Sequence, residues 1–146
     1  MSGQAAYPAF AGIEERIDTI AMDGGTAPAR AVAELLEIGE HVLEAWVRAR
    51  GEVPTEALKE GFRLLALHRQ GARGEPSFNA CRETCRELAY HYNLISIEPD
   101  HPDTGHRLTL AAMIARHLTL FVGGKLEVAG LGAFCCSAKP LRAAGH

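Results

Sequence analysis

The sequence predicts a mainly α-helical fold: a single-domain bundle of four to five helices with a small two-stranded β element near the C-terminus. Apolar residues recur at spacings of three and four along most of the chain, as is typical of amphipathic helices. Glycine and proline clusters interrupt this pattern where loops would be needed. The 146 residues, 47% hydrophobic and 23% charged, suit one globular domain. We therefore expect a flexible arm over 1–11, one helical domain over 12–136 and a tail over 137–146.

The first two helices have clear limits in the sequence. Isoleucines at helical spacing predict a helix over 12–21, and an Asp-Gly-Gly cluster should end it. The next helix is the clearest element. Thr26 offers an N-cap oxygen, Pro28 suits the first turn, and Gly51 marks the C-terminus. Its apolar face consists of Val32, Leu35, Leu36, Gly39, Val42, Leu43, Trp46 and Val47.

Two more helices are expected over 55–70 and 77–93. Thr55 and Ser77 are suitable N-terminal caps, and the loop between the helices contains glycine and proline. The first of these helices has a broad apolar face. The inner stripe of the second consists of Phe78, Cys81, Cys85, Leu88, Ala89 and Tyr92.

The β element and the last helix complete the prediction. Apolar residues alternate over 94–97 and again over 125–129, which predicts two short paired strands. The segment 108–122 between them is apolar on almost all sides, which favours a central, buried helix. Gly123 and Gly124 should end that helix.

The composition excludes several classes of protein. The net charge of −3 and the pI of about 6.2 argue against a protein that coats nucleic acids, which would be strongly basic. No run approaches the roughly 18 uncharged apolar residues that a membrane helix requires. Because the first residues lack a basic patch followed by an apolar run, we expect no signal peptide, a cytoplasmic location and no association with membranes.

The most unusual feature of the composition is the supply of soft metal ligands, with 4 Cys and 7 His. Thiolates of four cysteines can bind zinc or iron, or hold an iron–sulfur cluster. In a cytosolic protein, metal or redox use of cysteines is commoner than structural disulfides. The candidate ligands are Cys81, Cys85, Cys135, Cys136, His91 and His117.

Packing offers an alternative explanation for part of this set. Cys81 and Cys85 occupy positions where the helix needs apolar side chains, and free cysteine packs well as a small hydrophobe. The side chains of Cys135 and Cys136 would diverge in a strand, so adjacent cysteines rarely bind one metal. His91 fits a boundary histidine bonded to a backbone carbonyl.

A second candidate metal site lies in the loop before the last helix. His101, Asp103 and His106 together offer imidazole and carboxylate groups, which suit zinc, nickel or iron. The alternative is turn chemistry, in which Asp103 or Thr104 caps the helix that follows.

These features favour a small accessory or sensor protein that binds a metal, an iron–sulfur cluster or a redox partner through Cys and His. A protein partner or a homo-oligomer is expected, whereas no catalytic motif indicates an enzyme. One alternative is a helical protein–protein interaction module with structural cysteines. The other, disfavoured by the interleaved glutamates, is a small DNA-binding regulator that uses the 77–93 helix. Its phosphate contacts would be Arg69, Arg73, Arg82 and Arg86.

Overall fold

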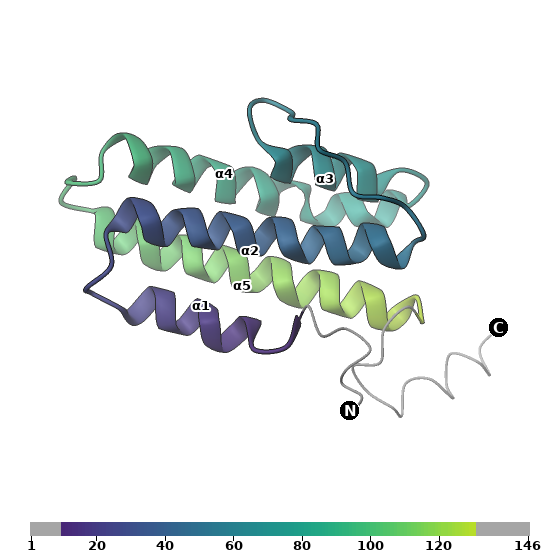
Figure 1. Ribbon diagram of the computed structural model, residues 1–146, viewed down its shortest axis with the longest axis horizontal. Helices are drawn as coiled ribbons and strands as arrows, with labels where there is room; N and C mark the ends of the chain where they lie inside the picture. Colours follow the sequence, from purple (N-terminus) through teal and green to yellow (C-terminus); the bar gives the residue numbers. More distant parts are fainter. Residues whose placement is uncertain (1–9, 131–146) are drawn as a thin grey trace.

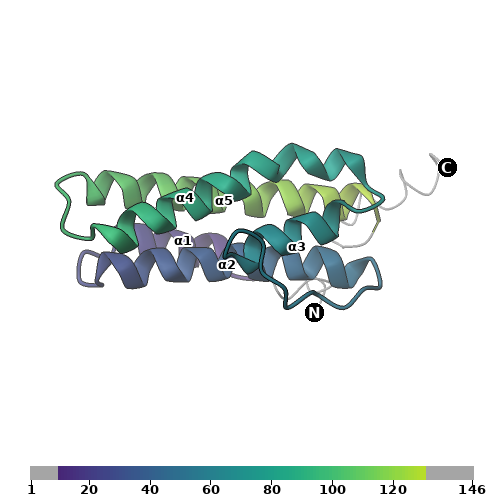
Figure 2. The same cartoon turned by 90° about the horizontal axis from the view of Figure 1, so that it is seen from above.

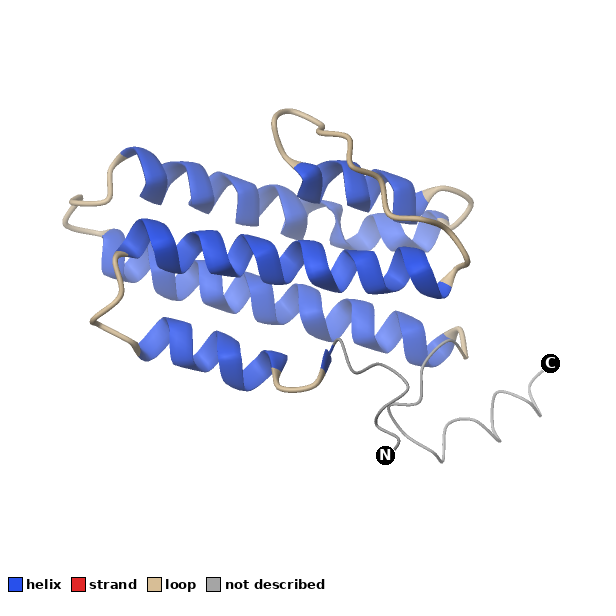
Figure 3. Ribbon diagram, in the orientation of Figure 1, coloured by secondary structure: helices blue, strands red, loops and turns tan. Residues whose placement is uncertain are grey.

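The computed structural model describes residues 10–130, which form a mainly helical bundle. Figure 3 shows helices and loops and no strand among these residues. The predicted tail and most of the predicted arm lie outside the described residues. The elements are α1 (Ile13–Met22), α2 (Pro28–Ala49), α3 (Arg63–Ala72), the 3₁₀ helix η3 (Pro76–Cys81), α4 (Arg82–Ile97) and α5 (Thr104–Val128).

Helices α2 and α5 lie side by side along the bundle and run in the same direction (Figure 1). Helices α1 and α4 run the opposite way, with α1 packed mainly on α5 and α4 packed on both central helices. The shorter α3 packs on α2 and α4 near the end of α2, so it covers only one end of the bundle (Figure 2). Across the described range, no helix has both the length and the apolarity needed to cross a bilayer.

The helix predicted over 12–21 is observed as Ile13–Met22, whereas the N-cap predicted for the next helix is wrong. Helix α1 buries the three isoleucines that recur at helical spacing. Pro28 occupies the first turn of α2, although the N-cap position belongs to Ala27 and not to Thr26. The Thr26 hydroxyl instead donates a hydrogen bond to Asp23, at 2.5 Å. Gly51 follows α2 with a φ of 85°, a left-handed conformation that glycine adopts without steric cost.

The predicted helix over 55–70 is wrong in its first half, because α3 begins only at Arg63. Glu60 and Gly61 have φ angles of 55° and 86°, which no α-helix accommodates. The side chain of Gln70 also binds the preceding loop, accepting a hydrogen bond from the Thr55 amide at 2.8 Å and donating one to the Val53 carbonyl at 2.9 Å. Backbone groups of the loop therefore find hydrogen-bond partners without forming a helix.

The predicted β element is wrong within the described residues. Residues 94–97 belong to α4, and 125–128 belong to α5, which continues through Gly123 and Gly124. A glycine inside a helix costs about 1 kcal/mol relative to alanine. Burying a large apolar side chain gains about 1.5–3 kcal/mol, and Leu126 beyond the glycines is fully buried. The two glycines together cost about 2 kcal/mol on this scale, so the burial of Leu126 offsets the local preference for a break.

Trp46 joins three elements at one corner of the bundle. Its ring stacks on Phe78 of η3, with the centroids 4.8 Å apart and the planes 5° from parallel. Its Nε1 donates a hydrogen bond to the Gly71 carbonyl of α3 at 2.9 Å, and the same oxygen accepts one from Arg50 Nη1 at 2.7 Å. These contacts fix the position of η3, which carries the site described next.

We expect the substitution Gly71→Ala to lower the free energy of unfolding by about 1–3 kcal/mol, the usual cost of overpacking. A Cβ atom at Gly71 would lie 2.7 Å from Trp46 Cδ1 and 3.1 Å from Phe78 Cε2. Denaturant unfolding measures the effect. The control is Gly124→Ala in α5, where a Cβ meets nothing within 4 Å. Equal stability of the two variants would contradict the close packing at this corner.

Candidate functional site

Two thiols lie at the start of α4. Cys81 is the last residue of η3 and the N-cap position of α4, and Cys85 lies one helical turn further on. Both are unbridged cysteines, with exposed fractions of 1% and 0%. The amides at a helix N-terminus favour negative charge, and this effect stabilises the thiolate form of a cysteine placed there.

His68 of α3 lies beside these thiols. The residue is 5% exposed, and its ring stacks on Phe78, with the centroids 5.5 Å apart. The carbonyl oxygen of Phe78 is 3.0 Å from His68 Nε2 and accepts a hydrogen bond from Cys81 Sγ at 3.4 Å. Because a carbonyl oxygen only accepts, Nε2 carries the proton that is donated to it. The Phe78 carbonyl oxygen therefore accepts hydrogen bonds from both the His68 imidazole and the Cys81 thiol.

The two cysteines have opposite pKa shifts. A hydrogen bond from the Cys85 thiol is the main cause that lowers the pKa of Cys81, and the bond and charge of His68 add to it against the effect of burial. The pKa of Cys85 is raised, because its proton is held in the bond to Cys81, because it is buried and because the Cys81 charge repels a second one. Of the two thiols, Cys81 therefore loses its proton more readily than Cys85.

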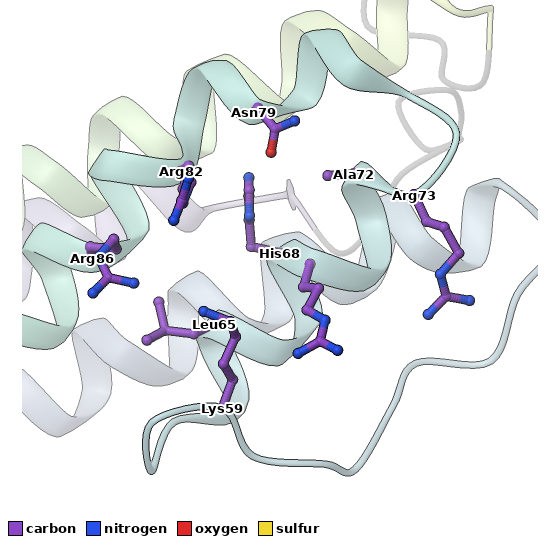
Figure 4. Close-up of a pocket in the computed structure, with 9 residues that line it drawn as sticks. Lys59, Leu65, His68, Ala72, Arg73, Asn79, Arg82 and Arg86 are labelled. Carbon is purple, nitrogen blue, oxygen red and sulfur yellow. The ribbon is translucent and has the colours of Figure 1, made fainter.

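A basic cavity of about 390 Å³ lies between α3 and α4. In Figure 4 the His68 side chain extends from α3 toward Asn79, with Arg82 beside it. His68 therefore contributes both to the cavity wall and to the thiol cluster. The cavity is lined by Lys59, Leu65, His68, Arg69, Ala72, Arg73, Asn79, Arg82 and Arg86.

The structure does not gather the other predicted ligands around Cys81 and Cys85. His91 is half-buried, and its Nδ1 lies 2.9 Å from the Glu87 carbonyl oxygen, as the backbone-bonded alternative predicts. His117 is exposed on α5. Cys135 and Cys136 lie outside the described residues.

The second predicted metal site is a turn at the start of α5. His101 Nδ1 accepts a hydrogen bond from the Asp103 amide at 3.0 Å, and Asp103 occupies the N-cap position without a side-chain bond to the helix. The side chains of Asp103 and His106 are exposed. Over residues 10–130, no group of three or more His, Cys, Asp or Glu side chains is arranged to hold a metal ion.

Sequence reasoning missed His68. A usable signal was present, because His68 lies three residues after Leu65 and four after Leu64, on the apolar face of the predicted helix. A buried histidine needs a hydrogen-bond partner, so a histidine on an apolar helix face is a candidate site residue. The identity of that partner depends on how η3 turns the chain back, which the pattern does not reveal.

Comparisons of the chain with protein-family models, with curated proteins and with solved structures found no match.

Proposed function

We propose that the chain is a small accessory or sensor protein that acts through reversible oxidation of the Cys81–Cys85 pair. The observation that carries this proposal is the cluster of Cys81, Cys85 and His68 at the N-terminus of α4. A low-pKa thiol next to a second, protonated thiol is the arrangement that a redox-sensing dithiol requires.

The Cα spacing of the two cysteines falls within the range of a disulfide, whereas their Cβ atoms must come closer together. Residues four apart in an α-helix have Cα atoms about 6 Å apart. Disulfides span Cα separations of about 4.4–6.8 Å. Cβ atoms four residues apart on a helix are about 5–6 Å apart, and a disulfide needs about 3.5–4.5 Å, so its formation requires local movement at Cys81. Cys81 ends a 3₁₀ segment, whose hydrogen bonds are weaker than those of an α-helix, so this end of the pair adjusts more readily.

Hydrogen peroxide is the oxidant that this chemistry uses. The Cys81 thiolate attacks one peroxide oxygen, the O–O bond breaks, and the leaving hydroxide takes a proton to become water. The resulting sulfenic acid is attacked by the sulfur of Cys85, the S–O bond breaks, and the hydroxide leaves as water with the Cys85 proton. One peroxide and two thiols thus give one disulfide and two waters.

Access to the buried sulfurs is a requirement of the proposal. The basic cavity reaches the outer side of His68, and four of the six residues of η3 are exposed. Opening of η3 must withdraw the buried Phe78 and Cys81 from the core, whereas its other four residues already face solvent, so the opening can stay local. We therefore expect opening of η3 to govern how fast an oxidant reaches Cys81.

Oxidation of the full chain with one equivalent of hydrogen peroxide tests the proposal. Trypsin cleaves after Arg82, so the two cysteines fall in different peptides, GEPSFNACR and ETCR. We expect mass spectrometry without reductant to detect these peptides as a linked pair, which a thiol reductant separates. The link should be absent in Cys81→Ser and in Cys85→Ser.

Two outcomes would contradict the proposal. One is that Cys81 and Cys85 resist thiol reagents until the protein unfolds, which favours the interaction module with structural cysteines. The other is that oxidation joins either cysteine only to Cys135 or Cys136. Binding of zinc or iron stays a separate prediction, tested by elemental analysis of anaerobically purified protein, and the absence of near-stoichiometric metal would remove it.

A further inference from the structure

Cationic side chains are concentrated around the cavity between α3 and α4. The whole chain has a net charge of −3, with 15 Lys and Arg. A third of these 15 cations line this one cavity, whereas no Asp or Glu does. The five cationic side chains are Lys59, Arg69, Arg73, Arg82 and Arg86.

Three of these cations have no anionic partner among residues 10–130. Arg86 is held by Glu60 through two hydrogen bonds, of 3.0 and 3.1 Å, and Lys59 binds the same carboxylate at 3.0 Å. These bonds lower the pKa of Glu60 to about 2, so the carboxylate stays charged. In the described part of the chain, no hydrogen bond or ion pair involves the guanidinium groups of Arg69, Arg73 and Arg82.

The unpartnered guanidinium groups come from two helical elements that face each other. Arg69 and Arg73 lie one turn apart at the end of α3, and Arg82 begins α4 on the other side of the cavity. Figure 4 shows Arg82 on one side of His68 and Arg73 on the other. Like charges held around a concave surface repel one another, and a bound anion relieves this repulsion. Guanidinium groups bind phosphate oxygens through paired hydrogen bonds, and the Asn79 amide adds a neutral donor at the rim.

The surroundings favour a small anion over a nucleic acid. Glu60, Glu83 and Glu87 line the neighbouring depression along α4, directly beyond Arg86. An extended phosphate backbone that followed α4 would pass these three carboxylates and be repelled by them. A compact ligand within about 390 Å³ would meet the cations and no carboxylate among the residues that line the cavity.

We infer that the cavity between α3 and α4 binds the phosphate groups of a small phosphorylated molecule, through Arg69, Arg73 and Arg82. This inference is independent of the proposed thiol chemistry, because the guanidinium groups do not depend on the oxidation state of Cys81 or Cys85.

Calorimetric titration of the reduced full chain with inorganic pyrophosphate at low salt tests the inference. We expect saturable binding with one site per chain. The variants Arg69→Gln and Arg82→Gln should each weaken it about tenfold or more, the usual effect of losing a charge-assisted hydrogen bond. Both residues are exposed, so the substitutions should leave the fold intact, and circular dichroism checks this.

The matched control is Arg30→Gln. Arg30 is an exposed residue at the start of α2, at the opposite end of the bundle from α3 (Figure 1). Its removal subtracts the same charge and should change the pyrophosphate affinity less than about twofold, because surface charges separated by more than a Debye length are screened.

Three outcomes would overturn the inference: absence of pyrophosphate binding, equal weakening in the Arg30→Gln control, or binding of a short DNA duplex in place of pyrophosphate. The last would support the DNA-binding alternative. The Cys81→Ser variant separates this inference from the proposed function, because it should bind pyrophosphate as the wild type does while losing disulfide formation.

Discussion

Replacing Phe78 with alanine is expected to lower the free energy of unfolding by about 3–5 kcal/mol. Phe78 is fully buried, and its ring lies against three others, those of Trp46, His68 and Phe121, with centroids 4.8, 5.5 and 5.9 Å away. Truncation leaves a cavity where η3, α2, α3 and α5 meet. Because domains are stable by only about 5–15 kcal/mol, much of the stability would be lost. Denaturant unfolding of the variant and the wild type measures this change in the free energy of unfolding.

The matched control is Leu58→Ala, which removes a large apolar side chain that is 66% exposed. This change should alter stability by no more than about 0.5 kcal/mol. A Phe78→Ala variant as stable as this control would mean that η3 does not pack into the bundle as the structure has it. The geometry of the candidate site would then be wrong as well, because the Phe78 carbonyl accepts hydrogen bonds from both His68 and Cys81.

The pH dependence of Cys81 alkylation should shift strongly in Cys85→Ala. The Cys85 thiol is the largest cause that lowers the pKa of Cys81 in the wild type. The alkylation rate should therefore reach half its plateau well below the ordinary thiol value of about 8.5. Removing the Cys85 donor removes the largest cause, so the midpoint should rise by about one unit or more. Below both midpoints, the rate should fall about tenfold or more.

Iodoacetamide labelling followed by mass analysis of the GEPSFNACR peptide measures this rate for Cys81 alone. The plateau at high pH reports access to the sulfur, whereas the midpoint reports its ionisation. The control is Cys85→Ser, whose hydroxyl still donates a hydrogen bond and should keep the midpoint nearer to that of the wild type. If Ala and Ser at this position give the same midpoint, the hydrogen bond from residue 85 does not set the pKa of Cys81.

The sequence was sufficient to predict helices that are determined by the pattern of neighbouring residues. The isoleucines of α1 and the apolar face of α2 follow helical spacing, and the structure buries them as this spacing predicts. The sequence was insufficient where contacts between residues far apart in the chain determine the structure. The loop before α3 is held by the side chain of Gln70, which lies 15 residues beyond Thr55. Likewise, Leu126 keeps α5 helical past two glycines because the core has room for it.

The same difference between local pattern and long-range contact applies to the candidate site. Four-residue spacing on a helix was enough to place Cys81 and Cys85 on one face. The contact of His68 with the Phe78 carbonyl joins residues 10 apart across a turn, and no periodic pattern encodes that turn. Arg69, Arg73, Arg82 and Arg86 were grouped by their charge as phosphate contacts of a DNA-binding helix, and they do line one surface. That surface is a concave cavity between helices.

The position of Trp46 makes the protein its own optical reporter. It is the chain's single tryptophan, and its indole is buried between Phe78 and the Gly71 carbonyl. Its fluorescence therefore senses the corner formed by α2, α3 and η3, whereas far-ultraviolet circular dichroism averages over every helix. Local opening of η3 changes the tryptophan fluorescence without changing the circular dichroism. The two spectra together therefore distinguish opening of the thiol site from unfolding of the bundle.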